Sequence, residues 1–114
     1  MITKLLIANR GEIAARIART CDRLGIGYVT VSVDEDRELS YHDGALATVR
    51  LPAGGYLDAA ALVRAATETG CEAIHPGYGF LSENADFARA VRSAGLVFVG
   101  PSSRVIESMA DKSS

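Results

Sequence analysis

An uninterrupted apolar run, an amphipathic stretch and a β-branched run follow one another at the start of the chain. Lys4-Leu-Leu-Ile-Ala8 is typical of a strand covered on both faces. Residues 11–24 predict a helix, and residues 28–33, Tyr-Val-Thr-Val-Ser-Val, predict a second strand. The apolar residues of this helix recur at helical spacing, at Ile13, Ile17, Cys21 and Leu24. The order strand, helix, strand restricts the chain to folds built on parallel strands.

The same alternation continues along the chain. Further strands are predicted at 46–51, 71–75 and 96–99, helices at 58–69 and 83–94, and a last helix after a cap at Ser102 or Ser103. We therefore predict an α/β domain with a mostly parallel sheet, helices on both faces and right-handed crossovers. The loops after Ala8, Val33 and His75 should lie on one edge of that sheet.

Size and charge exclude several classes of protein. The 114 residues suffice for about one domain, and residues 109–114 have helical character without a closing glycine or proline, so we expect the natural polypeptide to continue beyond Ser114. A net charge of −2 with scattered Lys and Arg argues against nucleic-acid binding. No apolar run approaches the ~20 residues of a membrane span, so we expect a cytoplasmic protein without a membrane partner. Cys21 and Cys71 are predicted to be buried, reduced thiols.

A glycine-rich stretch joins one predicted strand to the next helix. It reads Ala73-Ile-His-Pro-Gly-Tyr-Gly-Phe-Leu-Ser-Glu-Asn84. Pro76 fixes one backbone angle, Gly77 and Gly79 open conformations that other residues avoid, and Ser82 can cap the following helix. Such a stretch is either an ordinary connection or a loop that faces a ligand.

Charged residues follow the first two predicted strands. Arg10 could contact a charged ligand or pair with Glu12 or another carboxylate, and the three spaced glycines of a dinucleotide site are absent. Residues 34–36, Asp-Glu-Asp, are predicted to form a solvated acidic loop rather than a ribose site. His75 is interpreted as a hydrogen-bonded histidine that orients its loop, because no second acid, base or nucleophile is near it in sequence.

Three strings together resemble the N-terminal segment of biotin carboxylases. They are Ala8-Asn-Arg-Gly-Glu-Ile-Ala14, the His75-to-Asn84 string and Phe98-Val-Gly-Pro-Ser102, and the resemblance extends from Lys4 to Lys112. It implies a Rossmann-like three-layer pre-ATP-grasp domain that occupies residues 1–114 and precedes ATP-grasp and C-terminal domains absent from this chain. It also implies a parent enzyme that uses MgATP and bicarbonate to carboxylate N1′ of biotin on a carrier protein, through a carboxyphosphate intermediate.

The resemblance also implies roles for single residues. Lys112 matches a lysine that contacts ATP, Tyr78 and Gly79 match positions that border the biotin pocket, and Arg19 matches a dimer contact. Arg23 stands where relatives often have an acid, which puts an inherited Arg–carboxylate pairing in doubt. No catalytic residue or metal ligand is expected within these 114 residues, and ATP, Mg²⁺ and biotin should not bind tightly to them alone. The expected partners are the ATP-grasp remainder of the enzyme, the biotin carboxyl carrier and, in the full enzyme, a second copy.

The resemblance also bears on the subfamily. Gly11, Phe80 and Asn84 are more similar to the acyl-CoA carboxylase branch than to pyruvate carboxylases, which favours an acetyl- or propionyl-CoA carboxylase of fatty acid metabolism. The segment 40–48 departs from the relatives' usual string. Two alternatives stay open: the equivalent domain of another ATP-grasp ligase such as carbamoyl-phosphate synthetase, and a free-standing α/β interaction module.

Overall fold

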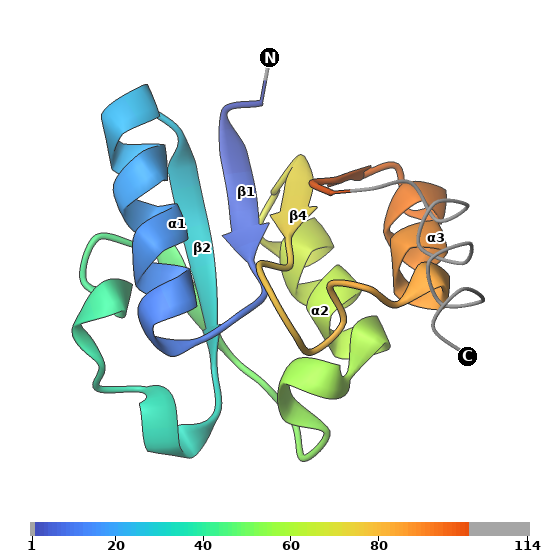
Figure 1. The fold of residues 1–114 in the computed structure, drawn as a ribbon, viewed down its shortest axis with the longest axis horizontal. Helices are drawn as coiled ribbons and strands as arrows, with labels where there is room; N and C mark the ends of the chain where they lie inside the picture. The colour runs from blue at the N-terminus through green and yellow to red at the C-terminus, as the bar shows by residue number, and fades with distance from the viewer. Residues whose placement is uncertain (1, 101–114) are drawn as a thin grey trace.

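A computed structural model describes residues 2–100, in which strands and helices alternate (Figure 1). The elements in chain order are β1 (Lys4–Ile7), α1 (Gly11–Leu24), β2 (Gly27–Ser32), the 3₁₀ turns η1 (Asp34–Asp36) and η2 (Ser40–His42), β3 (Ala47–Arg50), the 3₁₀ turn η3 (Gly55–Leu57), α2 (Ala59–Glu68), β4 (Ala73–His75), α3 (Ala85–Ser93) and β5 (Val97–Phe98). The helix predicted after Ser102 or Ser103 lies outside the described residues.

The five strands form one sheet in the order β3-β2-β1-β4-β5, and every neighbouring pair is parallel. In the centre, Leu5 of β1 is in register with Tyr28 of β2 on one side and Ala73 of β4 on the other. The α/β class and the parallel core predicted from the alternating pattern are confirmed. Parallel pairing also brings the loops after β1, β2 and β4 to one edge, as predicted.

The helices cover both faces of the sheet. α1 packs on one face, where Leu5, Ile7 and Tyr28 are buried against it, and α2 and α3 pack on the other, where Leu6 and Val29 are buried (Figure 1). Successive side chains of a strand point to opposite faces, so the continuous apolar run of β1 supplies both layers at once.

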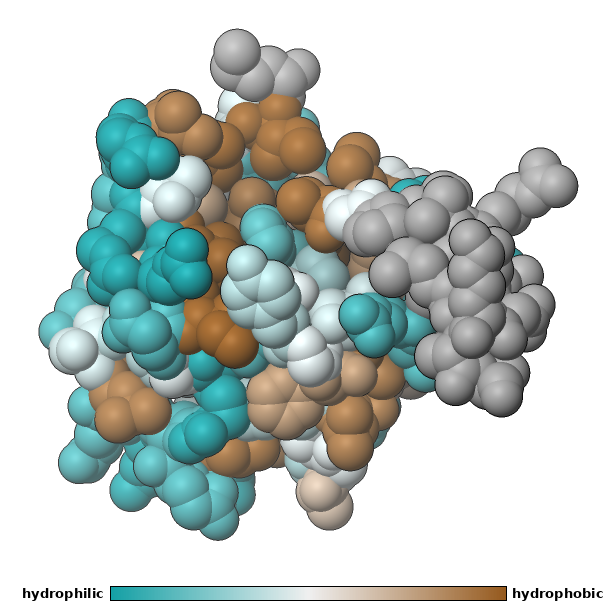
Figure 2. All heavy atoms as spheres, in the orientation of Figure 1, coloured by the Kyte–Doolittle hydropathy of each residue, from teal (hydrophilic) through white to brown (hydrophobic). Residues whose placement is uncertain are grey.

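The buried face of α1 matches the predicted one at Cys21 but not at the other predicted positions. Ala14, Ala18 and Cys21 face the sheet, whereas Ile13 and Ile17 are only half-buried and Leu24 is 63% exposed. Small side chains let the helix approach the strands closely. The bulkier residues then line an apolar hollow beside α1, visible as a brown strip next to the helix in Figure 2.

The ends of the elements depend on local hydrogen bonds. Ser82 was predicted to cap α3, but the cap is Asn84, whose Oδ1 accepts from the N–H of Phe87 at 2.8 Å. The chain makes a further turn between Leu81 and Asn84 before the helix begins, so Ser82 lies too early. Cys21 and Cys71 are buried free thiols, as predicted.

Candidate functional site

The strand order changes direction between β1 and β4, and this position is the switch point of the sheet. β1, β2 and β3 follow one another outward on one side, and β4 then begins on the other side of β1. The loops that leave β1 and β4 therefore diverge at the carboxyl edge, the position where open α/β sheets bind ligands. In this chain those loops are residues 8–10 and 76–80, so the glycine-rich stretch lies at the point that the fold favours for binding.

Asn9 joins the two loops. Its side chain is 1% exposed, and its Nδ2 donates to the carbonyl oxygens of Pro76 at 2.8 Å and Tyr78 at 2.6 Å. Its Oδ1 accepts from the N–H of Arg10 at 2.8 Å. A buried amide that satisfies two carbonyl groups fixes their direction, so Asn9 determines how the backbone of the β4 loop faces.

The β4 loop uses left-handed backbone conformations. Gly77, Gly79 and Phe80 have φ of 65°, 67° and 48°. A Cβ on Gly77 would lie 2.6 Å from Cγ2 of Ile13 and 2.9 Å from Nδ2 of Asn9, so only glycine fits between this loop and α1. Phe80 is the single non-glycine residue with positive φ between residues 2 and 100, a strain that the surrounding contacts must offset.

His75 ends β4 and is tied to its own loop. Its Nδ1 accepts from the N–H of Gly77 at 3.1 Å, and burial lowers its pKa. An accepting Nδ1 and a lowered pKa keep the ring neutral, with the proton on Nε2. The predicted hydrogen-bonded histidine that orients the loop is thus present.

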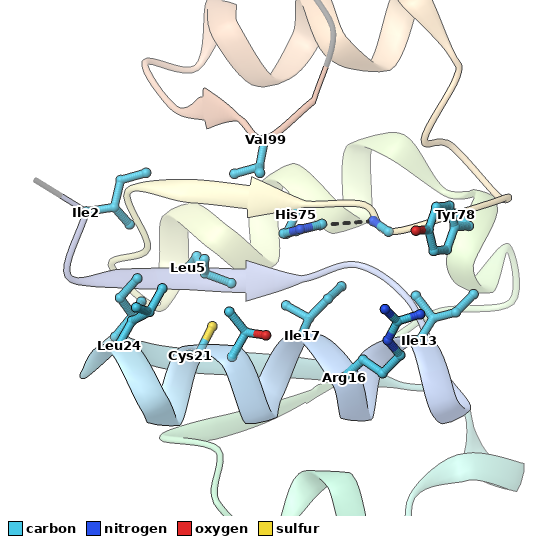
Figure 3. A pocket seen from close by; sticks show the side chains of 13 residues that line it. Ile2, Leu5, Ile13, Arg16, Ile17, Cys21, Leu24, His75, Tyr78 and Val99 are labelled. Carbon is cyan, nitrogen blue, oxygen red and sulfur yellow. Dashed lines mark hydrogen bonds between the residues drawn. The ribbon is translucent and has the colours of Figure 1, made fainter.

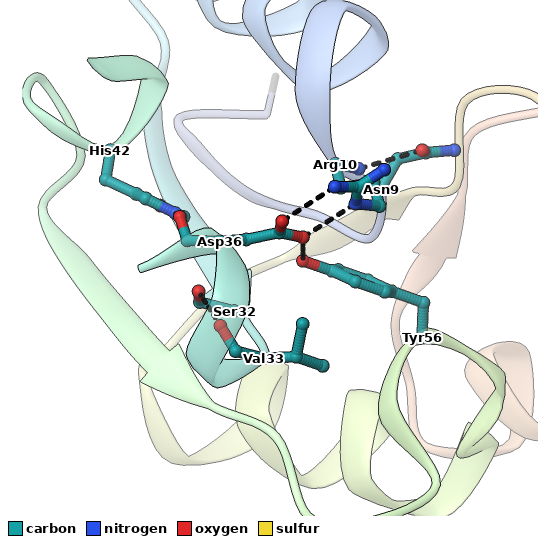
Figure 4. Close-up of polar contacts among 7 residues, drawn as sticks. All are labelled: Asn9, Arg10, Ser32, Val33, Asp36, His42 and Tyr56. Atoms are coloured by element: carbon teal, nitrogen blue, oxygen red, sulfur yellow. Dashed lines mark hydrogen bonds and ion pairs between the residues drawn. The ribbon is translucent and has the colours of Figure 1, made fainter. Parts of the chain in front are cut away.

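Asp36 departs from the predicted solvated loop. It is 2% exposed, and the guanidinium of Arg10 donates to both of its oxygens at 2.7 Å (Figure 4). The Tyr56 hydroxyl donates to Oδ2 at 2.5 Å. These bonds lower the pKa of Asp36 to about 2, with the Arg10 hydrogen bond the largest cause. Sheet pairing brings residues 10, 36 and 56 together, and sequence spacing does not reveal it.

His42 and Tyr56 connect the segment around Asp36, which follows β2, to neighbouring parts of the site. His42 contacts the carbonyl oxygen of Asp36 through Nε2 at 3.0 Å and the hydroxyl of Thr30 through Nδ1 at 2.7 Å. The ring of Tyr56 also contacts that of Phe80, with centroids 5.1 Å apart. Burial, then the bond to Asp36, raises the pKa of Tyr56, so its hydroxyl stays a donor. Arg10, Asp36 and Tyr56 thereby support the β4 loop from one side.

An apolar groove of about 460 Å³ runs between α1 and the β4–β5 half of the sheet (Figure 3). It is lined mainly by Leu5, Ile13, Ile17, Leu24 and Val99. His75, Gly77 and Tyr78 form one end of it, and the Tyr78 side chain is 66% exposed there. The β4 loop thus offers an accessible aromatic face beside an apolar hollow.

Among residues 2–100, no group of three or more His, Cys, Asp or Glu side chains is arranged to hold a metal ion. Within the same residues, no helix combines the length and apolar character needed to cross a membrane.

The sequence pattern of the family described as "Biotin carboxylase, N-terminal domain" matches residues 1–106. The chain belongs to this family. The three strings that suggested the resemblance all lie within the match, and the loops described above carry two of them.

Two similar proteins align with nearly the whole chain. The mitochondrial methylcrotonoyl-CoA carboxylase subunit alpha of Oryza sativa subsp. japonica is 53% identical, over 98% of this chain and 16% of the relative. The biotin carboxylase of Pseudomonas aeruginosa is 52% identical, over 98% of this chain and 26% of the relative. This biotin carboxylase N-terminal domain thus spans about a sixth to a quarter of the length of these relatives.

A solved structure has the same fold. It is the biotin carboxylase domain dimer of Hydrogenobacter thermophilus 2-oxoglutarate carboxylase in complex with MgADP, ADP and bicarbonate. Its TM-score is 0.89 at 43% identity, over 94% of this chain and 24% of that chain. The predicted Rossmann-like fold of a biotin carboxylase N-terminal domain is confirmed.

The predicted site residues of this biotin carboxylase N-terminal domain lie in three places. Tyr78 and Gly79 are together on the β4 loop at the switch point. Arg19 is on α1, 63% exposed, and its Nη2 lies 3.0 Å from Oε1 of Glu12. Lys112 lies outside the described residues. The sequence interpretation missed Asn9 as a loop clasp and Tyr56 as a partner of Asp36, although Asn9 lies within a motif string.

Proposed function

We propose that this chain is the N-terminal part of a biotin carboxylase whose complete polypeptide uses MgATP and bicarbonate to carboxylate biotin on a carrier protein. The observation that carries the proposal is the geometry of the β4 loop. The buried Asn9 side chain holds this loop by hydrogen bonds at the switch point of the sheet, with Tyr78 exposed. Family membership adds the chemistry of the parent enzyme.

In this proposal, Tyr78 and Gly79 form one wall of the biotin pocket. Biotin presents a planar ureido ring and an apolar bicyclic body. An aromatic face suits the apolar body, and a backbone N–H suits the ureido carbonyl. The apolar groove that begins at Tyr78 would extend the same wall.

ATP and magnesium belong to the remainder of the enzyme in this proposal. We assign an ATP contact to Lys112, since an ammonium group can donate charge-assisted hydrogen bonds to phosphate or adenine-side acceptors. Magnesium requires several oxygen ligands, and residues 2–100 offer no clustered carboxylates for it, so we assign the ion to the ATP-grasp part.

The proposed assembly is a homodimer that uses the exposed face of α1. Arg19 and Arg23 lie on that face, and the exposed Arg19–Glu12 pair could exchange its partner for one in a second copy at little cost. The related biotin carboxylase domain of Hydrogenobacter thermophilus is described as a dimer. The biotin carboxyl carrier is the second proposed partner, reaching the site through its biotin.

We further propose the acyl-CoA carboxylase branch, in fatty acid metabolism and in the cytoplasm. Gly11, Phe80 and Asn84 support this branch, and the similarity to a methylcrotonoyl-CoA carboxylase subunit is consistent with it.

The test uses the full-length enzyme and measures bicarbonate-dependent phosphate release with biotin and ATP varied in turn. Tyr78→Ala should raise the KM for biotin by roughly tenfold, the value of one lost aromatic contact, and leave the KM for ATP unchanged. Lys112→Ala should do the reverse. If both Michaelis constants were unchanged in both variants, the two assignments would have to be withdrawn.

A further inference from the structure

The side-chain amide of Asn9 fits its three partners in a single orientation. Its Oδ1 faces the N–H of Arg10, and its Nδ2 faces the carbonyl oxygens of Pro76 and Tyr78. The reversed amide would set an oxygen against two carbonyl oxygens and an NH₂ against an N–H. The donor hydrogens of Asn9 therefore point at the β4 loop.

This contact also fixes the direction of the next N–H group. The described residues contain no cis peptide bond, and in a planar trans peptide the C=O and N–H point in opposite directions. Because the carbonyl of Tyr78 points inward at Asn9, the N–H of Gly79 points away from it. That N–H has no hydrogen-bond partner among residues 2–100.

Without the clasp, this peptide would be free to turn. Glycine accepts both signs of φ at similar cost, so rotation of the Tyr78–Gly79 peptide plane meets little resistance from Gly79 itself, whose φ is 67°. A Cβ on Gly79 would find no atom within 4 Å, so the space on that side of the residue is open. The bond from the 1% exposed Asn9 to the carbonyl of Tyr78 is the restraint on this peptide, while the following carbonyl, that of Gly79, accepts from the N–H of Ser82 at 2.9 Å.

We propose that Asn9 is a positioning residue that holds the N–H of Gly79 outward, beside the exposed ring of Tyr78, as a donor to the ureido oxygen of biotin. The inference rests on the proposed function, because the ligand is biotin only if the chain belongs to a working biotin carboxylase. Asn9 itself touches no ligand; it acts through the backbone of the β4 loop.

The decisive variant is Asn9→Asp in the full-length enzyme. Aspartate keeps the size and the acceptor for Arg10 but sets an oxygen against the two carbonyls, so the peptide should turn away. We expect the KM for biotin to rise roughly tenfold, as for loss of a buried hydrogen bond, with the KM for ATP and biotin-independent ATP cleavage unchanged. Asn9→Ser, which keeps one short donor, should give a smaller rise and serves if Asn9→Asp fails to fold.

A second readout isolates the ureido oxygen. 2-Iminobiotin has a nitrogen in place of that oxygen, so the normal enzyme should bind it more weakly than biotin, as measured by competitive inhibition. In the unmodified enzyme the inhibition constant of 2-iminobiotin should therefore exceed the KM for biotin. In Asn9→Asp the ratio of this inhibition constant to the KM for biotin should fall toward one. A ratio equal to that of the unmodified enzyme would overturn the positioning role.

The matched control is Asp58→Ala. Asp58 caps α2 by accepting from the N–H of Ala61 at 3.0 Å and makes no bond to the β4 loop, so its loss lowers stability without turning the peptide. An equal rise in the KM for biotin in this control would overturn the inference in favour of general loosening. Absence of biotin-dependent ATP cleavage in the unmodified full-length protein would overturn the proposed function as well. If Tyr78→Ala raised the KM for biotin and Asn9→Asp left it unchanged, this inference alone would be overturned.

Discussion

Asp36 is a buried carboxylate whose three donor contacts come from residues far away in sequence. Two are from the guanidinium of Arg10 and one is from the hydroxyl of Tyr56. Buried charges are tolerated only when they are paired and hydrogen-bonded. Arg10 had two interpretations from sequence, a ligand contact or an ion pair, and the structure has the ion pair.

Asp36→Asn should lower the free energy of unfolding of the 114-residue chain by about 2 kcal/mol, because it leaves the Arg10 charge without its counter-ion; the exposure of Arg10 keeps the loss below the 3–5 kcal/mol of a fully buried pair. Asp34→Asn is the control, since Asp34 pairs with Arg50 at 2.9 Å in an exposed position and should change stability by less than about 0.5 kcal/mol. Urea unfolding measures both, and equal losses would contradict the role of burial.

The same carboxylate should make stability depend on pH in acid. Its folded pKa of about 2 lies below the unfolded value of about 3.9, so its contribution is fully present above pH ~4 and is lost as the pH falls toward 2. The stability difference between the unmodified chain and Asp36→Asn should therefore shrink from pH 6 to pH 2. Glu72, whose pKa is also lowered, by hydrogen bonds from Thr3, acts in both proteins and cancels. A difference that stays constant over this range would contradict the assignment.

At the scale of the element, the start of α3 shows how one turn changes a cap. Asn84→Ala should lower the free energy of unfolding by about 1 kcal/mol, because the N–H of Phe87 loses its acceptor. Ser82→Ala should have little effect, and Asn84→Asp should keep most of the stability, since a carboxylate also caps. Thermal unfolding of the three variants is the measurement, and a larger loss for Ser82→Ala would restore the cap predicted from sequence.

The whole molecule has a core on each face of the sheet, and both cores are formed by residues that the structure describes. We therefore expect the 114-residue chain to unfold cooperatively by itself, yet to show no biotin-dependent ATP cleavage. Our proposal assigns the magnesium site to the ATP-grasp part of the enzyme, and each missing charge-stabilising group costs several kcal/mol of transition-state stabilisation. Circular dichroism during denaturation and a phosphate-release assay test the two parts. Turnover by the isolated chain would show that the active site has been assigned to the wrong domain.

The local pattern of apolar and polar residues was sufficient to predict the parallel sheet and the positions of its helices, and three short strings were sufficient to suggest the family. Apolar runs and helical spacing report which side chains avoid water, and this information is contained within a few consecutive residues. Parallel pairing follows from strands that alternate with helices, so the meeting of the β1, β2 and β4 loops at one edge was predictable. Tyr78 and Gly79 could be singled out because their string is specific.

Tertiary structure alone decided which partners those residues have. Asn9 reaches Tyr78 across 69 positions of sequence, and Arg10 reaches Asp36 across 26, because hydrogen bonds form between neighbours in space. Asp36 lies in a polar turn, so the sequence predicted that it would be solvated. In the structure, η1 holds Asp36 where Tyr56 of η3 can donate to it, and the carboxylate is buried. The bulky stripe of α1 looked like core, but the alanine face packs on the sheet and Leu24 is left in the groove wall. Helical periodicity gives the spacing of a face, whereas the neighbouring elements decide which face is covered.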